Sequence, residues 1–302
     1  MLTKRFGLCT TAALLAIALT LSTQAAVAAD EPVCGTSSPA SNNYSTTVCV
    51  VAPAAGAEIT GDQTVSATVS TTGNRTVDQM IFGWDDEYLL TDFEAPYTFV
   101  LPSDRWADGP KTLTARATMS DGFTTEVVTV PITLVNGVET PAPNTNVFTP
   151  RGVEGSDGGL VIGAVGDGAF GSANAAQVVD LIDSWNPDMF LYLGDVYEHG
   201  SIAEFHNWYG DTDLWGQFRS ITNPTPGNHE YETLDATPYF YYWDNVPHYY
   251  SFDAGGWHFI SLDSNSEFGG TSTSSAQYQW LQNDLAANQD ACTVAFFHHP
   301  RY

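Results

Sequence analysis

Three short polar motifs in the second half of the chain carry side chains that can bind metal ions and phosphate. They are Gly194-Asp195, Pro226-Gly227-Asn228-His229-Glu230 and His298-His299-Pro300. Each motif follows a short apolar run that is typical of a buried strand. In α/β folds, ligand sites gather beyond the carboxyl ends of the strands. We therefore expect these motifs to meet at one edge of a sheet.

Four side chains in this part of the chain are candidate metal ligands. Asp167 directly follows the apolar run 160–166, and the motifs add Asp195, Asn228 and His298. Carboxylate, amide and imidazole groups suit borderline divalent metals better than a thiolate site would. Two ions about 3.5–4 Å apart would hold a phosphoryl group and lower the pKa of a bound water. This set indicates a hydrolase that acts on phosphate esters.

These motifs resemble those of the calcineurin-like metallophosphoesterases, which have the purple acid phosphatases as relatives. The family pattern is an Asp motif, then GD, GNH[DE], a His before x-Pro, and a final GHxH. The resemblance implies two divalent or trivalent metal ions (iron, zinc or manganese) and four ligands: Asp167, Asp195, Asn228 and His298. Asp195 would bridge both ions. His229 would protonate the leaving oxygen of the substrate, and Glu230 would orient His229.

The sequence departs from this pattern near the first two motifs. Ala169 stands where the family often has His, and Glu198 stands where purple acid phosphatases have a tyrosine ligand. Tyr197 lies one residue too early, so it or Glu198 would serve as a ligand if the loop adjusts. His199 and Arg301 are further candidate site residues, and Arg301 would contact phosphate.

The final GHxH motif does not occur before the sequence ends at Tyr302. This departure predicts that the catalytic domain, residues 158–302, is the N-terminal part of a longer one. Half of a sandwich would expose a large apolar face, which soluble monomers avoid. We expect the truncated chain to be inactive or weakly active by itself.

The first 28 residues have the pattern of a secretory signal peptide. Lys4 and Arg5 precede the apolar run Ala12–Leu21, and Ala26-Val27-Ala28 fits a small-residue cleavage site. The apolar run is shorter than the roughly 20 residues of a membrane-spanning helix. We expect a secreted protein, periplasmic or extracellular, that does not insert into the membrane after cleavage.

The acidic composition restricts the partners. The formal net charge is −26. A surface of this charge repels polyanions, which argues against nucleic-acid and anionic-membrane binding. A small phosphorylated substrate, hydrolysed as a phosphate monoester by attack of a metal-bound hydroxide, is the expected partner of the site.

Residues 48–137 alternate apolar and polar side chains with the period of strands. Val65, Ala67 and Val69 are one such run, and the run Val128–Leu134 contains Pro131, which predicts an edge strand. These features resemble bacterial immunoglobulin-like (Ig-like) domains. Such modules act as spacers, or they contact glycans or cell surfaces. Residues 29–47 precede this domain, and we expect a disulfide between Cys34 and Cys49 in an oxidising compartment.

The predicted fold is multidomain: an all-β Ig-like sandwich, a linker over 138–157, and an incomplete α/β metallophosphoesterase sandwich with α-β-β-α layers. The expected function is that of an exported phosphatase-type hydrolase. An alternative from another class is a cell-surface binding or adhesion protein whose phosphoesterase domain is degenerate. Ala169 and the altered segment after Asp195 favour this alternative.

Overall fold

The structure is a computed structural model that describes residues 31–41, 43–152, 159–171, 173–266, 271–289 and 291–300. The predicted signal peptide, residues 1–28, and the candidate Arg301 lie outside these residues. Among the helices that the structure describes, none has the length and hydropathy needed to cross a bilayer. Beyond residue 30, the contacts join both predicted domains into one unit.

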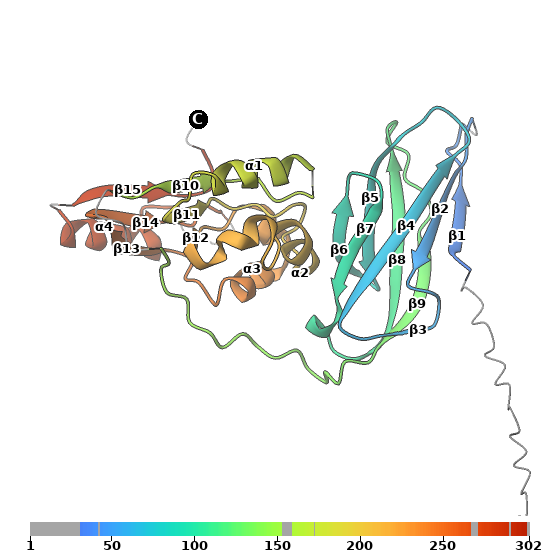
Figure 1. Cartoon of the computed structure of the whole chain (residues 1–302), viewed down its shortest axis with the longest axis horizontal. Helices are drawn as coiled ribbons and strands as arrows, with labels where there is room; N and C mark the ends of the chain where they lie inside the picture. The colour runs from blue at the N-terminus through green and yellow to red at the C-terminus, as the bar shows by residue number, and fades with distance from the viewer. Residues whose placement is uncertain are drawn as a thin grey trace, which may run out of the picture. The chain divides into compact units, whose positions relative to one another are not determined.

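Two β-sheets pack against each other in the first domain (Figure 1). The four-stranded sheet has the order β1-β2-β4-β7, with bounds Val33–Ser37, Thr46–Ala52, Asp62–Thr71 and Tyr97–Pro102. The five-stranded sheet has the order β3-β9-β8-β5-β6, with bounds Ala57–Ile59, Val128–Leu134, Gly109–Met119, Val77–Trp84 and Glu87–Asp92. A 3-10 turn, η1 (Ser103–Arg105), follows β7. The first domain is therefore the predicted β-sandwich.

Alternating apolar residues form the core between these sheets. Val65 and Ala67 on β4 are at most 5% exposed, as are Leu113, Ala115 and Ala117 on β8. Because successive side chains of a strand point to opposite faces, a period of two places one face of each strand inward. Cys34 and Cys49 lie opposite each other on β1 and β2, where they form a disulfide.

The prediction that Pro131 marks an edge strand is wrong. Its strand β9 pairs with β8 on one side and with β3 on the other. The pairing with β3 begins opposite Ile132, and the Pro131 carbonyl accepts a bond from the amide of Gly56. The proline therefore lies where the short partner strand begins, and the sheet tolerates its missing N–H there.

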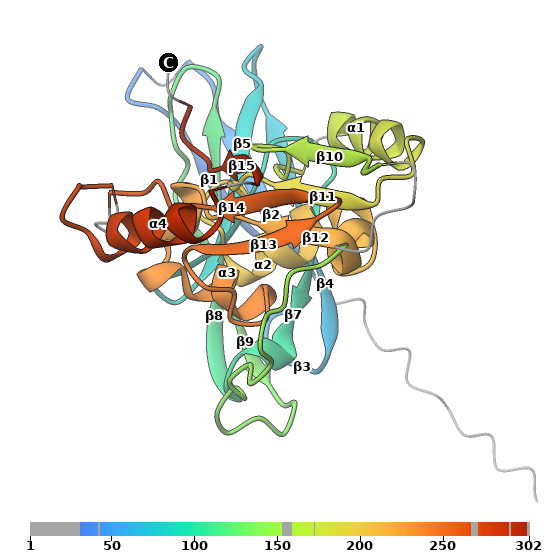
Figure 2. The same cartoon turned by 90° about the vertical axis from the view of Figure 1, so that its left-hand side faces the viewer.

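The second domain contains two three-stranded sheets among its described residues (Figures 1 and 2). In the first, β10 (Ile162–Val165), β11 (Met189–Tyr192) and β12 (Thr222–Pro224) are parallel. In the second, β13 (Tyr250–Ala254) and β14 (Trp257–Ser261) form a hairpin, and β15 (Cys292–Phe296) runs parallel to β14. This layout is the predicted alternating α/β domain.

The helical segments of this domain are short apart from two. The longer ones are α1 (Ala173–Asp183), which lies beside β10 in both views, and α4 (Ala276–Ala287). The shorter ones are α2 (Ile202–Glu204), η2 (Phe205–Tyr209), η3 (Leu214–Ile221), η4 (His229–Glu232), η5 (Leu234–Ala236) and α3 (Thr237–Tyr242). Most of these short segments sit in the connections that leave the carboxyl ends of β11 and β12.

Helix α2 begins at a complete capping box. The Ser201 hydroxyl accepts a hydrogen bond from the Glu204 amide at 3.1 Å, and the Glu204 carboxylate accepts one from the Ser201 amide at 3.0 Å. These bonds satisfy amides that the first turn of a helix otherwise leaves without partners. The helix continues directly into the π-helical turn η2, a form that is frequent at functional sites.

Candidate metal centre

The four predicted ligands lie together in space. Ligand atoms of Asp167, Asp195 and His298 are all within 4.8 Å of one another. The Nε2 atom of His298 is 3.0 Å from Oδ1 of Asn228 and 3.4 Å from Oδ2 of Asp195. Three of these residues follow β10, β11 and β12, whose carboxyl ends meet at one sheet edge, and the fourth follows β15.

His298 connects the two sheets and presents one ring nitrogen to the cluster. The carbonyl of Leu193, just after β11, lies 2.8 Å from its Nδ1, so this nitrogen must carry the hydrogen. In the neutral ring Nε2 is then an acceptor, and it faces the oxygens of Asn228 and Asp195. Acceptor atoms that face one another repel unless a proton or a cation lies among them. The donor set therefore fits a bound metal ion.

The backbone brings the ligands close through residues that tolerate positive φ. Asp167 and Asp195 have φ of 58° and 67°, a region in which Asp is enriched over other side chains. A Cβ on Gly227 would lie 2.0 Å from Oδ1 of Asp195. Glycine at this position thus allows the segment after β12 to approach the carboxylate, which a larger residue would prevent.

Glu230 connects the segment that carries Asp195 to the segment that carries Gly227. It is 1% exposed, and its carboxylate accepts bonds from the amides of Asp195 at 3.0 Å, Val196 at 2.7 Å and Gly227 at 2.6 Å. The pKa of Glu230 is raised to about 7. Burial is the largest cause and repulsion from Asp195 also raises the pKa, while the hydrogen bonds from the three amides lower it. This carboxylate therefore fixes the backbone that carries Asp195.

His229 is oriented by a different group from the one we expected. Its Nδ1 lies 2.5 Å from the carbonyl oxygen of Glu198, so Nδ1–H donates there, and Glu230 bonds to backbone amides instead. The other nitrogen, Nε2, lies 3.8 Å from Oδ2 of Asp195. The ring is partly exposed at the rim of the cluster, with a nitrogen that can exchange a proton.

Tyr197 reaches the ligands although it lies one position early in the sequence. Its hydroxyl donates to Oδ1 of Asp167, and its ring packs against His229 with centroids 4.3 Å apart. Burial raises the pKa of Tyr197, and the hydrogen bond to Asp167 adds to the effect. A phenolic oxygen is therefore among the candidate ligands, while Glu198 contributes its backbone carbonyl to His229.

Two other positions that the sequence singles out, His199 and Ala169, make packing and hydrogen-bond contacts. His199 packs its ring against Tyr88 of the Ig-like domain at 4.1 Å, and burial lowers the pKa of His199. Ala169, which replaces a frequent family ligand, is fully buried, and its amide donates to the hydroxyl of Tyr192 at 3.1 Å. That hydroxyl donates in turn to the carbonyl of Asp195, so this contact supports the ligand loop.

The sequence analysis did not identify Asp263, a buried acidic residue that contacts Tyr231. Asp263 is fully buried, accepts a bond from the hydroxyl of Tyr231 at 2.5 Å, and lies 3.1 Å from Nδ1 of His248. It follows β14 closely, so the signal that identified Asp167, an acid just beyond a strand, could have identified it. Asp263 holds Tyr231, which directly follows the predicted motif at Glu230.

Comparison with known proteins agrees with this geometry. Residues 47–115 match the family described as bacterial Ig domain, and residues 160–302 match the calcineurin-like phosphoesterase family. The chain is 33% identical to purple acid phosphatase 22 of Arabidopsis thaliana over 42% of this chain and 32% of the relative. It is 29% identical to purple acid phosphatase 15 of the same plant, over 47% of this chain and 33% of the relative.

The chain thus spans about a third of the length of the curated relatives it matches. Among solved structures it is similar to the fibronectin(III)-like modules of Clostridium thermocellum CbhA, at 31% identity over 29% of this chain and 93% of that one, with a TM-score of 0.26. The family matches and the relatives give one assignment: this chain carries a bacterial Ig domain followed by a calcineurin-like phosphoesterase domain homologous to the purple acid phosphatases.

Proposed function

We propose that the protein is an exported, metal-dependent phosphomonoesterase. One observation carries the proposal: the side chains of Asp167, Asp195, Asn228 and His298 converge at one sheet edge with a proton-bearing histidine beside them. Oxygen and nitrogen donors at this spacing are suited to a pair of divalent or trivalent ions such as iron, zinc or manganese. Such ions supply a water of lowered pKa and neutralise charge on the phosphoryl group.

Each ligand has a distinct task in this proposal. Asp195 is the most deeply buried of the four, and its Oδ1 accepts a hydrogen bond from the His229 amide at 3.0 Å, so it would be the central ligand. Asp167, Asn228 and His298 would hold the ions from the surrounding strand ends. Leu193 fixes the ring of His298 through its carbonyl, which keeps Nε2 aimed at the cluster.

His229 handles the proton of the leaving group. Because its Nδ1–H donates to the Glu198 carbonyl, Nε2 is the nitrogen that can carry the second hydrogen. In the protonated ring, Nε2–H would donate to the departing alkoxide, which makes His229 the general acid. Its distance of 3.8 Å from Asp195 Oδ2 places it next to the ligands without joining them.

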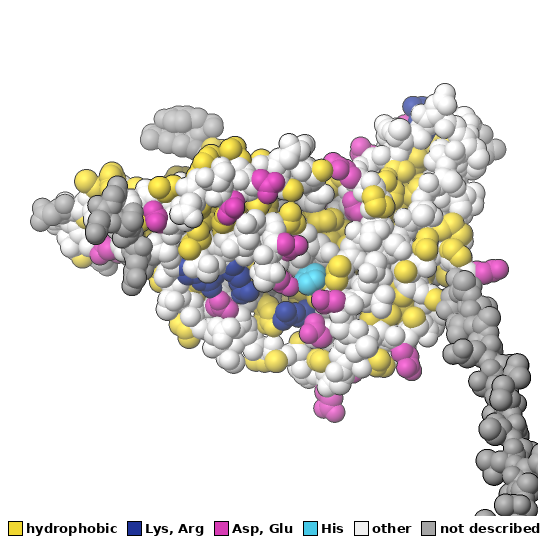
Figure 3. Space-filling view, in the orientation of Figure 1, with side chains coloured by type: hydrophobic (Ala, Val, Ile, Leu, Met, Phe, Trp, Pro, Cys, Tyr) yellow, Lys and Arg dark blue, Asp and Glu magenta, His cyan; other side chains and the backbone are white. Residues whose placement is uncertain are grey.

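The substrate class is that of small phosphate monoesters. The formal net charge is −26, and Figure 3 shows acidic side chains scattered over the face it draws, with Lys and Arg in few places. Such a surface disfavours polyanionic partners such as nucleic acids, whose binding depends on many cations. The pattern of the first residues supports export, and the disulfide between Cys34 and Cys49 suits an oxidising compartment.

The test measures metal content and hydrolysis together. Purified protein is loaded separately with iron, zinc and manganese, and its metal content is measured before assay with para-nitrophenyl phosphate and with its bis-ester. We expect bound metal and faster hydrolysis of the monoester, and loss of both in Asp195→Asn. Protein that binds none of the three metals would overturn the proposal.

One observation favours the alternative of a binding protein. Ala169 fills the place of a frequent ligand with a buried methyl group that cannot coordinate. A protein of this kind would bind glycan or cell-envelope material through its Ig-like domain and hydrolyse nothing. Pull-down of the protein on envelope polysaccharide, combined with an absence of bound metal in the same preparation, would favour this alternative.

A further inference from the structure

A tyrosine of the Ig-like domain bonds to a buried carboxylate of the phosphoesterase domain. The hydroxyl of Tyr88, on the edge strand β6, donates to Oε1 of Glu204, a residue 116 positions later in the chain. The ring of Tyr88 also packs against His199. Glu204 has no exposed surface. A buried carboxylate needs a hydrogen-bond donor such as this hydroxyl, because an unpaired charge in the protein interior costs roughly several kcal/mol.

Glu204 holds the segment that follows the ligand Asp195. Its carboxylate accepts bonds from the amides of Glu198 at 2.5 Å, His199 at 3.0 Å and Ser201 at 3.0 Å. Three amide donors and the Tyr88 hydroxyl therefore converge on one carboxylate. The pKa of Glu204 is raised to about 7 because the effect of burial exceeds that of the four hydrogen bonds, which lower the pKa. We call residues 198–201 the Glu204-bound loop.

This loop leads directly to the proton-transfer histidine. Glu198, whose amide is bound by Glu204, accepts at its carbonyl the hydrogen of His229 Nδ1 at 2.5 Å. A chain of three hydrogen bonds thus runs from Tyr88 through Glu204 and Glu198 to His229. The orientation of the His229 ring depends on where this carbonyl lies.

Further contacts fix the Ig-like domain at this position. The side-chain amide of Asn207, on η2, accepts from the Val100 amide at 2.7 Å and donates to the Val100 carbonyl at 2.8 Å, as a neighbouring strand would. Val100 lies on β7, the edge of the four-stranded sheet. The Ser201 hydroxyl donates to the carbonyl of Leu89 on β6. The domain is therefore attached through the open edges of both its sheets.

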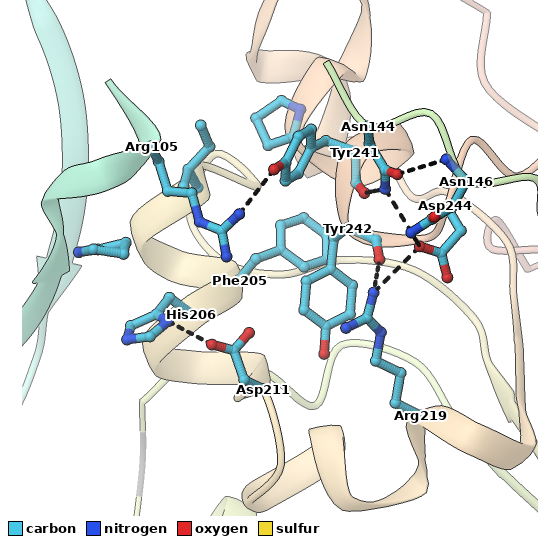
Figure 4. A pocket seen from close by; sticks show the side chains of 13 residues that line it. Arg105, Asn144, Asn146, Phe205, His206, Asp211, Arg219, Tyr241, Tyr242 and Asp244 are labelled. Atoms are coloured by element: carbon cyan, nitrogen blue, oxygen red, sulfur yellow. Dashed lines mark hydrogen bonds and ion pairs between the residues drawn. The ribbon is translucent and has the colours of Figure 1, made fainter. Parts of the chain in front are cut away.

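A polar pocket beside this interface is lined by residues of both domains (Figure 4). Arg105 of η1 donates to the hydroxyl of Tyr241 on α3 at 2.8 Å. The segment between the two domains is also held there. Asn144 donates to the carbonyl of Tyr241 at 2.6 Å. Asn245 donates to the carbonyl of Asn144 at 2.7 Å. A segment with these bonds is not a free tether.

We propose that the Ig-like domain is a working part of the phosphoesterase site and that Tyr88 is a positioning residue, which fixes His229 through Glu204 and the Glu204-bound loop. The inference rests on the proposed function for the role of His229. It replaces the expectation of a spacer, since a spacer needs no bond to a buried group of the domain it carries. Tyr88 touches neither substrate nor ligand and acts through the loop.

The experiment removes one hydroxyl. Tyr88→Phe keeps the ring against His199 and deletes the bond to Glu204, together with a bond between the hydroxyls of Tyr88 and Thr91 on the same strand. Hydrogen exchange of the amides of residues 198–201 is measured by mass spectrometry in the metal-free protein, so this readout does not depend on activity. We expect exchange to be about tenfold faster, the size of effect that loss of one hydrogen bond to a charged group produces. In the metal-loaded protein we expect kcat to fall about tenfold with KM unchanged.

The matched control is another tyrosine of the same domain. Tyr44 also donates to a carboxylate, Asp121 at 2.9 Å, but both of these residues belong to the Ig-like domain. Tyr44→Phe should leave the exchange of residues 198–201 and kcat at the wild-type level. Each variant should unfold in one cooperative transition with a melting temperature above that of the assay, which shows that the comparison is made on folded protein.

The outcomes separate the two proposals. If Tyr88→Phe exchanges and turns over like the wild type, the Ig-like domain is a spacer and the inference is wrong. If wild-type protein binds no metal, the proposed function fails, while the exchange readout still decides whether Tyr88 positions the loop. If Tyr44→Phe changes both readouts equally, the effect is general loosening of the domain, which also contradicts the inference.

Discussion

Two buried glutamates hold the two loops of the site, and they do so with the same chemistry. The Glu230 carboxylate accepts hydrogen bonds from three backbone amides around Asp195 and Gly227, all within the phosphoesterase domain. Glu204 accepts three amides of the next loop and a fourth bond from Tyr88 of the other domain. The pKa of each is raised to about 7, with burial as the largest cause.

In the proposed function, the difference between these two glutamates separates metal binding from proton transfer. Glu230 fixes the amide of a ligand, Asp195, whereas Glu204 fixes the carbonyl that orients His229. Changes at Glu230 should therefore remove the metal ions, and changes at Glu204 should misplace the histidine. The contacts of Glu230 thus lie within the phosphoesterase domain, whereas those of Glu204 involve both domains.

The largest effect is expected for Glu230→Ala. The change leaves three buried amides without partners, which costs about 4 kcal/mol of unfolding free energy, and it releases the backbone of Asp195. Urea denaturation and metal analysis should show both losses. Glu232, an exposed acid in the same short helix, provides the control, since Glu232→Ala should leave both quantities unchanged. Retention of full metal content in Glu230→Ala would contradict the division of roles.

An intermediate effect is expected in the pH dependence of stability. The pKa of Glu204 rises from 4.5 to about 7 on folding, so the folded state binds more protons between these values. The stability from this group is therefore fully present below pH 4.5 and is lost as pH rises through about 7, by about 3 kcal/mol in total. Glu204→Gln does not titrate, so the unfolding free energy should fall less steeply over this range.

The smallest effect is expected at the sheet edge. Asn207→Ala removes both bonds to Val100, which should lower the unfolding free energy by about 1–2 kcal/mol. Asn207→Asp keeps the acceptor but places a carboxylate oxygen against the Val100 carbonyl, so its loss should be at least as large as that of the alanine variant. Equal stability of the alanine variant and the wild type, by thermal or urea denaturation, would show that the edge is held by other contacts.

The sequence predicted those features that follow from local patterns. Strand alternation identified the buried face around Val65. Strand ends identified side chains that the structure brings together, because the carboxyl ends of neighbouring parallel strands lie at the same sheet edge. The capping box at Ser201 likewise involves residues only three positions apart. These features need only a few neighbouring residues.

The features that were missed depend on residues far apart in the chain. Within its capping box Glu204 pairs with the nearby Ser201, but Tyr88 lies 116 positions away and leaves no periodic pattern in the sequence. The orientation of His229 was assigned to its neighbour Glu230, whereas the backbone carbonyl of Glu198 provides it. Backbone groups occur at every position, so residue identity alone cannot indicate which of them meets a histidine.

The bidentate pairing of Asn207 with Val100 also bears on how the Ig-like domain can evolve. An unpaired strand edge is a template on which other chains add strands. Because β6 and β7 are covered by the neighbouring domain, neither needs the protective lysines or bulges of an independent module. A gene rearrangement that moved this module to a new protein would expose both edges, so its transfer should carry a risk of aggregation that a self-contained module avoids.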